Sequence, residues 1–443
     1  MHKDILSGFN IYMATISKSL LKLRERLCIH NTCNPVFIFL FALTCNLSFT
    51  NCSSSGKKIE VPGNDSTIII LPAPAYIDNA DKNALRVSCE RWYDSILGKN
   101  AFNGAVLVAK GGNIIFEKFR GSGHIGSNDS ITNTTAFNIA SVSKTITAMA
   151  ILKLSQEGKI KIDEELSSYF PTFNYPGVTV RTLLNHRSGL PNYLYFMEDL
   201  GWNKSLYIKN QDVFDYLVNR KSELKNIGTP GKRFTYCNTN YALLALLTEK
   251  ITGLPFPVFI QKEFFTPLNM THSFVFTLAD SAGVNPSYDW RGQMIPLNFL
   301  DLVYGDKNVY TTAEDLLIWE RALKPGIIFS AATLEQAYMP YSNEKPGLRN
   351  YGLGWRMNVY PNGKKMIYHN GWWHGYNAAF IRLIEEDATI IVMGNRFTRA
   401  IYKAKDLAGI FGTHYTSAKE EEGESTNITG TADNQEKTIK KRR

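Results

Sequence analysis

Two pairs of short apolar runs, one near each end of the globular part, restrict the fold of this chain more than any other feature. Residues 104–109 and 114–116 flank Lys-Gly-Gly-Asn, which is a strong hairpin signal. Residues 378–384 and 388–393 flank Glu-Glu-Asp in the same way. A hairpin alone cannot bury its apolar face, so the simplest arrangement is one antiparallel sheet built from both ends of the chain.

The segments between and around these hairpins have helical patterns. Residues 81–97 and 398–410 are predicted to be helices, and residues 141–156 form an amphipathic pattern. The middle of the chain is mostly helical, interrupted by loops that include residues 193–206 and 281–304. The predicted fold class is therefore α+β: an antiparallel sheet flanked by helices, with an inserted all-helical region.

The two ends of the chain differ in composition from the globular part. We expect a leader over residues 1–52, a tether over 53–80, one domain over 81–413 and a disordered polar tail over 414–443. Basic residues precede a short apolar run at residues 36–43, as in a signal peptide. The expectation is export, to the periplasm or to a membrane as a lipoprotein.

Cys52 follows this apolar run and is itself followed by Ser-Ser-Ser-Gly, as at a bacterial lipoprotein processing site. Asn51 stands where such sites usually have a small residue. The sequence therefore leaves open whether Cys52 is lipidated and anchors the chain to a membrane.

Charge and cysteine content exclude several classes of protein. The formal net charge is +9, but the basic residues of the body are spread thinly and form no stripe with aromatics, so nucleic-acid binding is not expected. Only Cys89 and Cys237 lie in the body, without metal-like spacing. We expect two buried or half-buried thiols, no disulfide framework, no metal and no cofactor.

Ser141 and Lys144 are the strongest candidates for catalysis. Residues three apart share a helix face, so the Lys144 amine is expected beside the Ser141 hydroxyl, which needs such a partner to become a nucleophile. Five other Ser-x-x-Lys sequences occur in the chain. Ser141 differs from them because an apolar, strand-like stretch precedes it and a long amphipathic helix follows.

Tyr236 and Asn238 form a second candidate element. They follow a Pro-Gly turn and precede an apolar helix pattern. A Tyr hydroxyl can transfer protons and an Asn amide can hold a substrate carbonyl. Tyr341 is the main competitor, because Tyr-x-Asn occurs there too.

The third element is His369-Asn-Gly371-Trp372, predicted to be the end of a short strand followed by a glycine-rich turn. Gly371 would let a substrate approach the strand edge. The backbone N–H of Trp372 is expected to form an oxyanion hole with that of Ser141. The bulky Trp372 and Trp373 are open to two interpretations, packing and substrate lining.

Ser141-Val-Ser-Lys144, Tyr236-Cys-Asn238 and His369-Asn-Gly371, in that order, resemble the motifs of the serine β-lactamase and penicillin-binding-protein superfamily. The likeness is to its class C-like branch and covers roughly residues 83–412. It implies that Ser141 is acylated, that Lys144 is its proton partner and that Tyr236 is the base or proton shuttle. Asn238, His369, Gly371 and Trp372 would bind substrate.

One departure from the superfamily pattern bears on the substrate. Many penicillin-active members have Lys-Thr-Gly at the third motif, where this chain has His369-Asn-Gly371. A histidine is charged only part of the time near neutral pH. The resemblance therefore implies an exported serine hydrolase acting on an amide or ester, such as a D-Ala-D-Ala peptide.

Two alternatives to this function remain open. One is a class C-like β-lactamase. The other is a non-catalytic surface lipoprotein that binds peptidoglycan or a partner through the same cleft. His186 is interpreted as structural, holding a loop, and His374 as a residue of the pocket rim.

Overall fold

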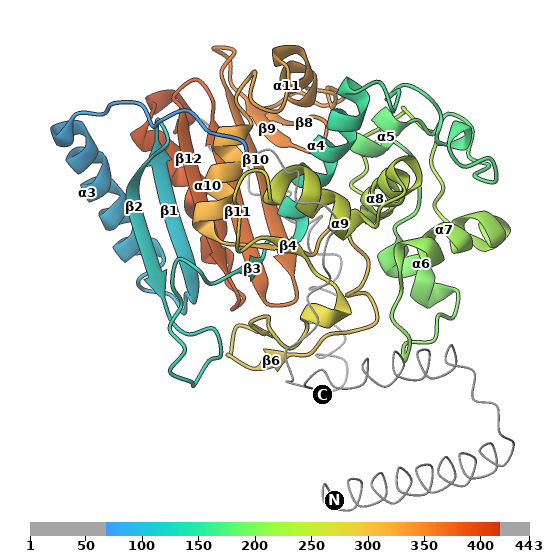
Figure 1. Ribbon diagram of the computed structural model, residues 1–443, viewed down its shortest axis with the longest axis horizontal. Helices are drawn as coiled ribbons and strands as arrows, with labels where there is room; N and C mark the ends of the chain where they lie inside the picture. Colours follow the sequence, from blue (N-terminus) through green and yellow to red (C-terminus); the bar gives the residue numbers. More distant parts are fainter. Residues whose placement is uncertain (1–67, 417–443) are drawn as a thin grey trace, which may run out of the picture. The chain divides into compact units, whose positions relative to one another are not determined.

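A seven-stranded antiparallel sheet is the centre of the part of the chain that the structure describes, residues 68–416 (Figure 1). The structure is a computed structural model. The predicted leader with Cys52, most of the predicted tether and nearly all of the predicted tail lie outside the described residues. In spatial order the strands are β2 (Asn113–Arg120), β1 (Gly104–Lys110), β12 (Ala388–Gly394), β11 (Tyr376–Leu383), β10 (Lys365–Trp373), β9 (Arg356–Val359) and β8 (Arg349–Tyr351).

The two predicted hairpins are confirmed and meet in this sheet. β1 pairs with β2, and β11 pairs with β12. β1 also pairs with β12, from Gly104 opposite Gly394 to Lys110 opposite Ala388, so the first and last strands of the domain are neighbours. The predicted α+β class, with a sheet built from both ends of the chain, is confirmed.

Side chains of β1 alternate between two hydrophobic cores, as expected for a strand covered on both faces. Val106 and Val108 join the core beneath α3 (Asn79–Ile96) and η6 (Arg399–Ile410). Leu107 belongs to the other core, which contains the inserted helices. The helices predicted at residues 81–97 and 398–410 are thus both present, the second as a 3-10 helix.

The inserted region is helical, as predicted, and in Figure 1 α5 to α8 lie to the right of the sheet. Its helices and the helices that follow it are α4 (Ser143–Gln156), α5 (Val180–Leu184), α6 (Tyr193–Asp199), α7 (Asn210–Asn219), α8 (Asn238–Thr252), α9 (Phe256–Ile260), α10 (Ala313–Ala322) and α11 (Ala331–Ala337). Short 3-10 or π turns are η1 (Ala140–Val142), η2 (Leu166–Ser168), η3 (Lys221–Glu223), η4 (Gln261–Phe265), η5 (Leu278–Asp280) and η7 (Thr413–Tyr415).

Two smaller sheets lie outside the main one. They consist of β3 (Phe137–Asn138), β7 (Val309–Thr311) and β4 (Phe274–Val275), and of β5 (Ser287–Tyr288) and β6 (Met294–Ile295). The prediction of loops at residues 193–206 and 281–304 was therefore wrong in part, because α6 lies in the first and β5 and β6 lie in the second. Asn192 caps α6 by accepting a hydrogen bond from the backbone N–H of Leu194.

The predicted strand end and the turn into the final hairpin are both present, but the strand is longer than expected. β10 continues without a break from Lys365 to Trp373, and the turn into β11 falls at His374 and Gly375. The pairing of β10 with β11 is regular to its end, with Trp372 opposite Asn377 and Trp373 opposite Tyr376. The third motif is therefore part of a strand.

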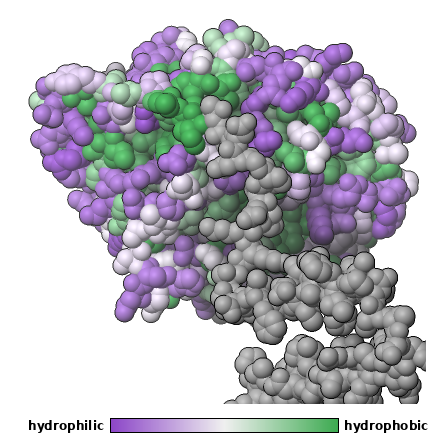
Figure 2. Space-filling model, in the orientation of Figure 1, coloured by the Kyte–Doolittle hydropathy of each residue, from purple (hydrophilic) through white to green (hydrophobic). Residues whose placement is uncertain are grey.

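The two cysteines of the body are buried free thiols, in agreement with the sequence. Among residues 68–416 no single helix is long and apolar enough to cross a membrane, and α8 with Phe256–Phe265 passes that test only as a pair bent by 76°. On the face shown in Figure 2, hydrophilic residues surround separate hydrophobic patches.

Candidate active site

Ser141 lies in the short turn η1, between strand β3 and helix α4. The residue before it, Ala140, has a φ of 47°, in the left-handed region that residues with a side chain rarely adopt. Asn138 stabilises this conformation, because its Oδ1 accepts a hydrogen bond from the Ala140 N–H at 2.7 Å. Strain of this kind persists only where the surroundings impose it, and it often accompanies a functional site.

Lys144 points its amine at Ser141. The Nζ atom lies 3.0 Å from the Ser141 Oγ and 2.7 Å from the backbone carbonyl oxygen of Asp306. The Lys144 side chain is fully buried, whereas Ser141 is partly exposed. The predicted proximity of the Lys144 amine and the Ser141 hydroxyl is confirmed.

Aromatic rings cover the rest of the Lys144 amine. Its Nζ lies 5.0 Å from the ring centroid of Tyr236 and 5.7 Å from that of Tyr241. Cations favour such positions near aromatic faces. The competitor Tyr341 has a different setting, since its hydroxyl bonds to Arg181 at 3.0 Å and to the Gln336 carbonyl at 3.2 Å.

Asn238 is the first residue of α8 and Tyr236 lies just before the N-cap; both side chains are half-buried. His186 holds the residue between them, because its Nδ1 accepts a hydrogen bond from the Cys237 N–H at 3.1 Å. The ring of His186 also packs against that of Tyr236, with centroids 4.3 Å apart. This arrangement agrees with the structural role predicted for His186, and Cys237 is a packed thiol as expected.

β10 approaches the Ser141 turn at Gly371. A Cβ at this position would lie 2.1 Å from the carbonyl oxygen of Ile139 and 3.2 Å from the Cβ of Ala140. Only glycine allows the strand to come so close. β9 pairs with β10 only as far as Tyr368, so residues 369–373 keep one edge without a strand partner in the described part of the chain.

Trp372 and Trp373 use their indoles for packing and hydrogen bonding. The ring of Trp372 packs against Phe397, with centroids 5.5 Å apart, and its Nε1 donates to the His374 carbonyl at 2.8 Å. The Trp373 Nε1 donates to the Asp301 Oδ1 at 2.6 Å. Both side chains are nevertheless half-exposed, so a lining role for their remaining surface is compatible with this packing.

His369 is buried and uncharged. Burial, with the positive charges of Arg356 and Lys144, holds its pKa well below the usual value for histidine. Its Nδ1 faces the Asn370 carbonyl at 2.7 Å and its Nε2 faces the Tyr351 hydroxyl at 3.2 Å. A neutral, fully hydrogen-bonded imidazole cannot supply the positive charge that a lysine has at this motif position.

Arg356 is the residue that the sequence analysis missed. It begins β9, opposite Tyr368 of β10, and its guanidinium lies 5.0 Å from the Tyr236 ring centroid. The side chain is half-buried and forms no ion pair with a described carboxylate. Its place directly after the apolar segment ending at Trp355 was visible in the sequence, but nothing there indicated that β9 lies beside Tyr236.

The described residues include no group of three or more His, Cys, Asp or Glu that could hold a metal ion. Ser141, Lys144 and Tyr236 lie together, and Gly371 brings β10 against their turn. This arrangement suits nucleophilic attack by Ser141 on a carbonyl group held along the open edge of β10.

A comparison with protein families gives one match that spans most of the chain. The family model described as Beta-lactamase matches residues 90–412. The chain is also 30% identical over 356 residues to penicillin-binding protein 4* of Bacillus subtilis (strain 168), a match that covers 75% of this chain and 78% of that protein.

Solved structures share the fold. A penicillin-binding protein from Bacillus halodurans has a TM-score of 0.62 at 23% identity, covering 74% of this chain and 98% of that one. A D-stereospecific amidohydrolase from Streptomyces sp. has a TM-score of 0.56 at 20% identity, with coverage of 74% and 98%. At these identities the likeness is one of fold.

The buried histidines predict how stability depends on pH. Burial, then the charge of Lys144, also holds the pKa of His186 well below its usual value. Below about pH 6.5 His186 and His369 bind a proton in the unfolded chain but stay neutral in the folded chain. The free energy of unfolding therefore falls as the pH falls, by up to about 1.4 kcal/mol per pH unit for each histidine.

Urea unfolding between pH 7.5 and 5.5 measures this effect. His369→Gln is expected to lose less stability than the wild type over that range, by roughly 1 kcal/mol. The exposed His272 is a matched control, and His272→Gln should keep the wild-type slope. Equal slopes for His369→Gln and the wild type would contradict a neutral buried His369.

Proposed function

The chain belongs to the serine β-lactamase and penicillin-binding-protein superfamily, and from that premise we propose that it is a serine hydrolase that forms an acyl-enzyme on Ser141. The observation that supports this most is the 3.0 Å contact between the Lys144 Nζ and the Ser141 Oγ. A serine hydroxyl becomes a useful nucleophile only with such a proton acceptor in reach. Export, with or without lipidation at Cys52, stays a prediction.

In the proposed acylation, the Lys144 amine is in its unprotonated form; the Ser141 Oγ attacks the substrate carbonyl carbon and its proton passes to that amine. The oxyanion that forms is held by the backbone N–H groups of Ser141 and Trp372. Tyr236 passes a proton to the leaving nitrogen or oxygen, and the carbonyl reforms as the bond to the leaving group breaks. Water then attacks the Ser141 ester, one of its protons goes to the Ser141 Oγ as the acid is released, and the Lys144 ammonium returns its proton to Tyr236.

The charge distribution favours one substrate class within this chemistry. Because His369 is neutral and Lys144 serves as the proton acceptor, the remaining cation beside Tyr236 is Arg356. A guanidinium binds a carboxylate through two parallel hydrogen bonds. We therefore propose that the preferred substrates have a carboxylate next to the scissile amide, as in peptides ending in D-Ala-D-Ala, and that simple esters are secondary substrates.

Replacing the nucleophile tests the proposed activity. Turnover of nitrophenyl acetate and of a D-Ala-D-Ala peptide by the wild type is expected to fall by on the order of a million-fold in Ser141→Ala. Ser143→Ala is the matched control for a serine in the same turn, because the Ser143 Oγ accepts a hydrogen bond from the Val309 N–H rather than facing Lys144. Undiminished turnover in Ser141→Ala would overturn the assignment, and no wild-type turnover would favour the binding-protein alternative.

The role of Arg356 makes a separate prediction about selectivity. In Arg356→Met the kcat/KM for the D-Ala-D-Ala peptide should fall about 10- to 100-fold, because a charged hydrogen bond contributes roughly 1.5–3 kcal/mol. The kcat/KM for nitrophenyl acetate, which has no carboxylate, should stay within about threefold. Equal losses on both substrates, or a wild type that does not cleave the peptide, would contradict the proposed class.

A further inference from the structure

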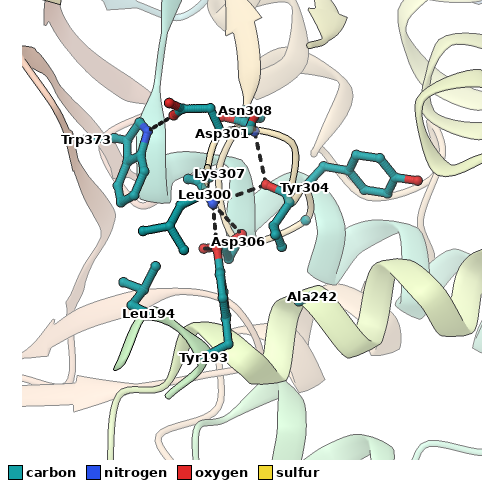
Figure 3. Close-up of polar contacts among 12 residues, drawn as sticks. Tyr193, Leu194, Ala242, Leu300, Asp301, Tyr304, Asp306, Lys307, Asn308 and Trp373 are labelled. Atoms are coloured by element: carbon teal, nitrogen blue, oxygen red, sulfur yellow. Dashed lines mark hydrogen bonds and ion pairs between the residues drawn. The ribbon is translucent and has the colours of Figure 1, made fainter. Parts of the chain in front are cut away.

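A second buried lysine, Lys307, lies next to Asp306, the residue whose backbone carbonyl accepts from Lys144 (Figure 3). It is 2% exposed. Its ammonium contacts three oxygens: the Tyr193 hydroxyl, the Val303 carbonyl at 3.2 Å and the Asp306 Oδ1 at 3.5 Å. Burial lowers the pKa of Lys307, although the carboxylates of Asp306 and Asp301 oppose that shift.

Tyr193 closes a triangle with Lys307 and Asp306. Its hydroxyl accepts from the Lys307 Nζ and donates to the Asp306 Oδ2 at 3.0 Å. Burial, and then the charge of Asp306, raises the pKa of Tyr193 well above its usual value, so the hydroxyl keeps its proton and remains a donor. Figure 3 shows Tyr193 rising toward Asp306 and Lys307, with Leu194 and Leu300 alongside.

The loop with Asp306 and Lys307 is fastened to the helix of the nucleophile. The Asp306 carbonyl accepts from the Lys144 Nζ at 2.7 Å, and the Gly305 carbonyl accepts from the Thr147 Oγ1 at 2.8 Å. A displacement of Asp306 would therefore move one of the two oxygens that direct the Lys144 amine. The other oxygen is the Ser141 Oγ.

Lys307 also contacts the strand on the opposite side of the site. Its Nζ lies 4.7 Å from the ring centroid of Trp373, the last residue of β10. The indole of Trp373 is fixed in turn by Asp301, whose carboxylate also pairs with His374 at 3.0 Å. Lys307 thus joins the loop that directs Lys144 to the end of the strand that contains Gly371.

We propose that Lys307, Asp306 and Tyr193 form a positioning unit that holds the Asp306 carbonyl and the end of β10 in place, and so keeps the Lys144 amine aimed at Ser141. The inference deepens the proposed function and depends on it. A role in folding alone is a poor explanation, because a buried ion pair contributes little net stability compared with apolar residues of the same size.

Tyr193→Phe tests the positioning unit with one atom removed. The Lys307 ammonium loses an acceptor and the Asp306 carboxylate loses a donor, so the loop can shift. The kcat for nitrophenyl acetate is expected to fall about 10- to 100-fold, as for small misplacements of catalytic groups, with KM unchanged within about twofold. A purely structural role would lower the amount of folded enzyme without slowing the folded molecules.

Tyr338→Phe is a matched control in the same chain. Tyr338 accepts from buried Arg382, which pairs with Glu320 at 3.3 Å, so its hydroxyl has a similar setting but bonds to a group other than Asp306 or Lys307. Each variant loses one buried hydroxyl next to an ion pair. Thermal unfolding and active-site titration with a fluorophosphonate should show comparable folded fractions, while only Tyr193→Phe is slow to acylate.

The double variant Asp306→Asn with Lys307→Met removes both charges together and leaves neither buried alone. It is expected to fold and to acylate at least about tenfold more slowly than the wild type. Wild-type kcat in folded Tyr193→Phe and in the double variant would overturn the inference while leaving the proposed function intact. A wild type with no turnover would instead overturn the proposed function, and the inference with it.

Discussion

The hydrogen bonds of a single buried amine organise the whole site. The Lys144 Nζ is directed by the Ser141 Oγ, three residues away, and by the Asp306 carbonyl, 162 residues away. The first contact follows from one turn of helix, whereas the second requires the inserted region to fold back onto α4. The proposed acyl-transfer site at Ser141 therefore depends on the correct packing of the Asp306 loop against α4.

The close approach of β10 to the Ser141 turn is the second constraint. Gly371 lies so near Ile139 that a methyl group would not fit between them. His369, on the same strand β10, is neutral because burial lowers its pKa more than the hydrogen bond to Asn370 raises it. Arg356 on the neighbouring strand β9 supplies a positive charge instead. The close approach at Gly371 is thus a property of β10, whereas the guanidinium of Arg356 comes from β9.

Much of the fold could be predicted from the sequence because the decisive signals are local. The apolar runs around residues 110–113 and 385–387 identified both hairpins, and helical periodicity identified α3 and α4. Ser141 and Lys144 were found for the same reason. The contact of Gly371 with Ile139 could not be predicted in the same way, because it is a tertiary contact that only the folded chain reveals.

Two of the three contacts that sequence analysis missed join residues far apart in the chain, whereas the third, between Asn138 and Ala140, is local. Arg356 reaches Tyr236 from another strand, Asn138 fixes the strained Ala140, and the Asp306 carbonyl directs Lys144 through a backbone atom that has no sequence signature. A backbone acceptor is the same in every residue, so only geometry identifies it. The identity of the substrate likewise depends on such contacts more than on the three motifs.

Peptide mapping by mass spectrometry, after trapping with a fluorophosphonate, tests acyl transfer to Ser141 most directly. Trypsin would release residues 121–144 as one peptide, because no Lys or Arg occurs between Arg120 and Lys144. The account predicts one adduct, on this peptide, with fragmentation placing it on Ser141 and not on Ser143. An adduct on another residue, or none on folded protein, would contradict it.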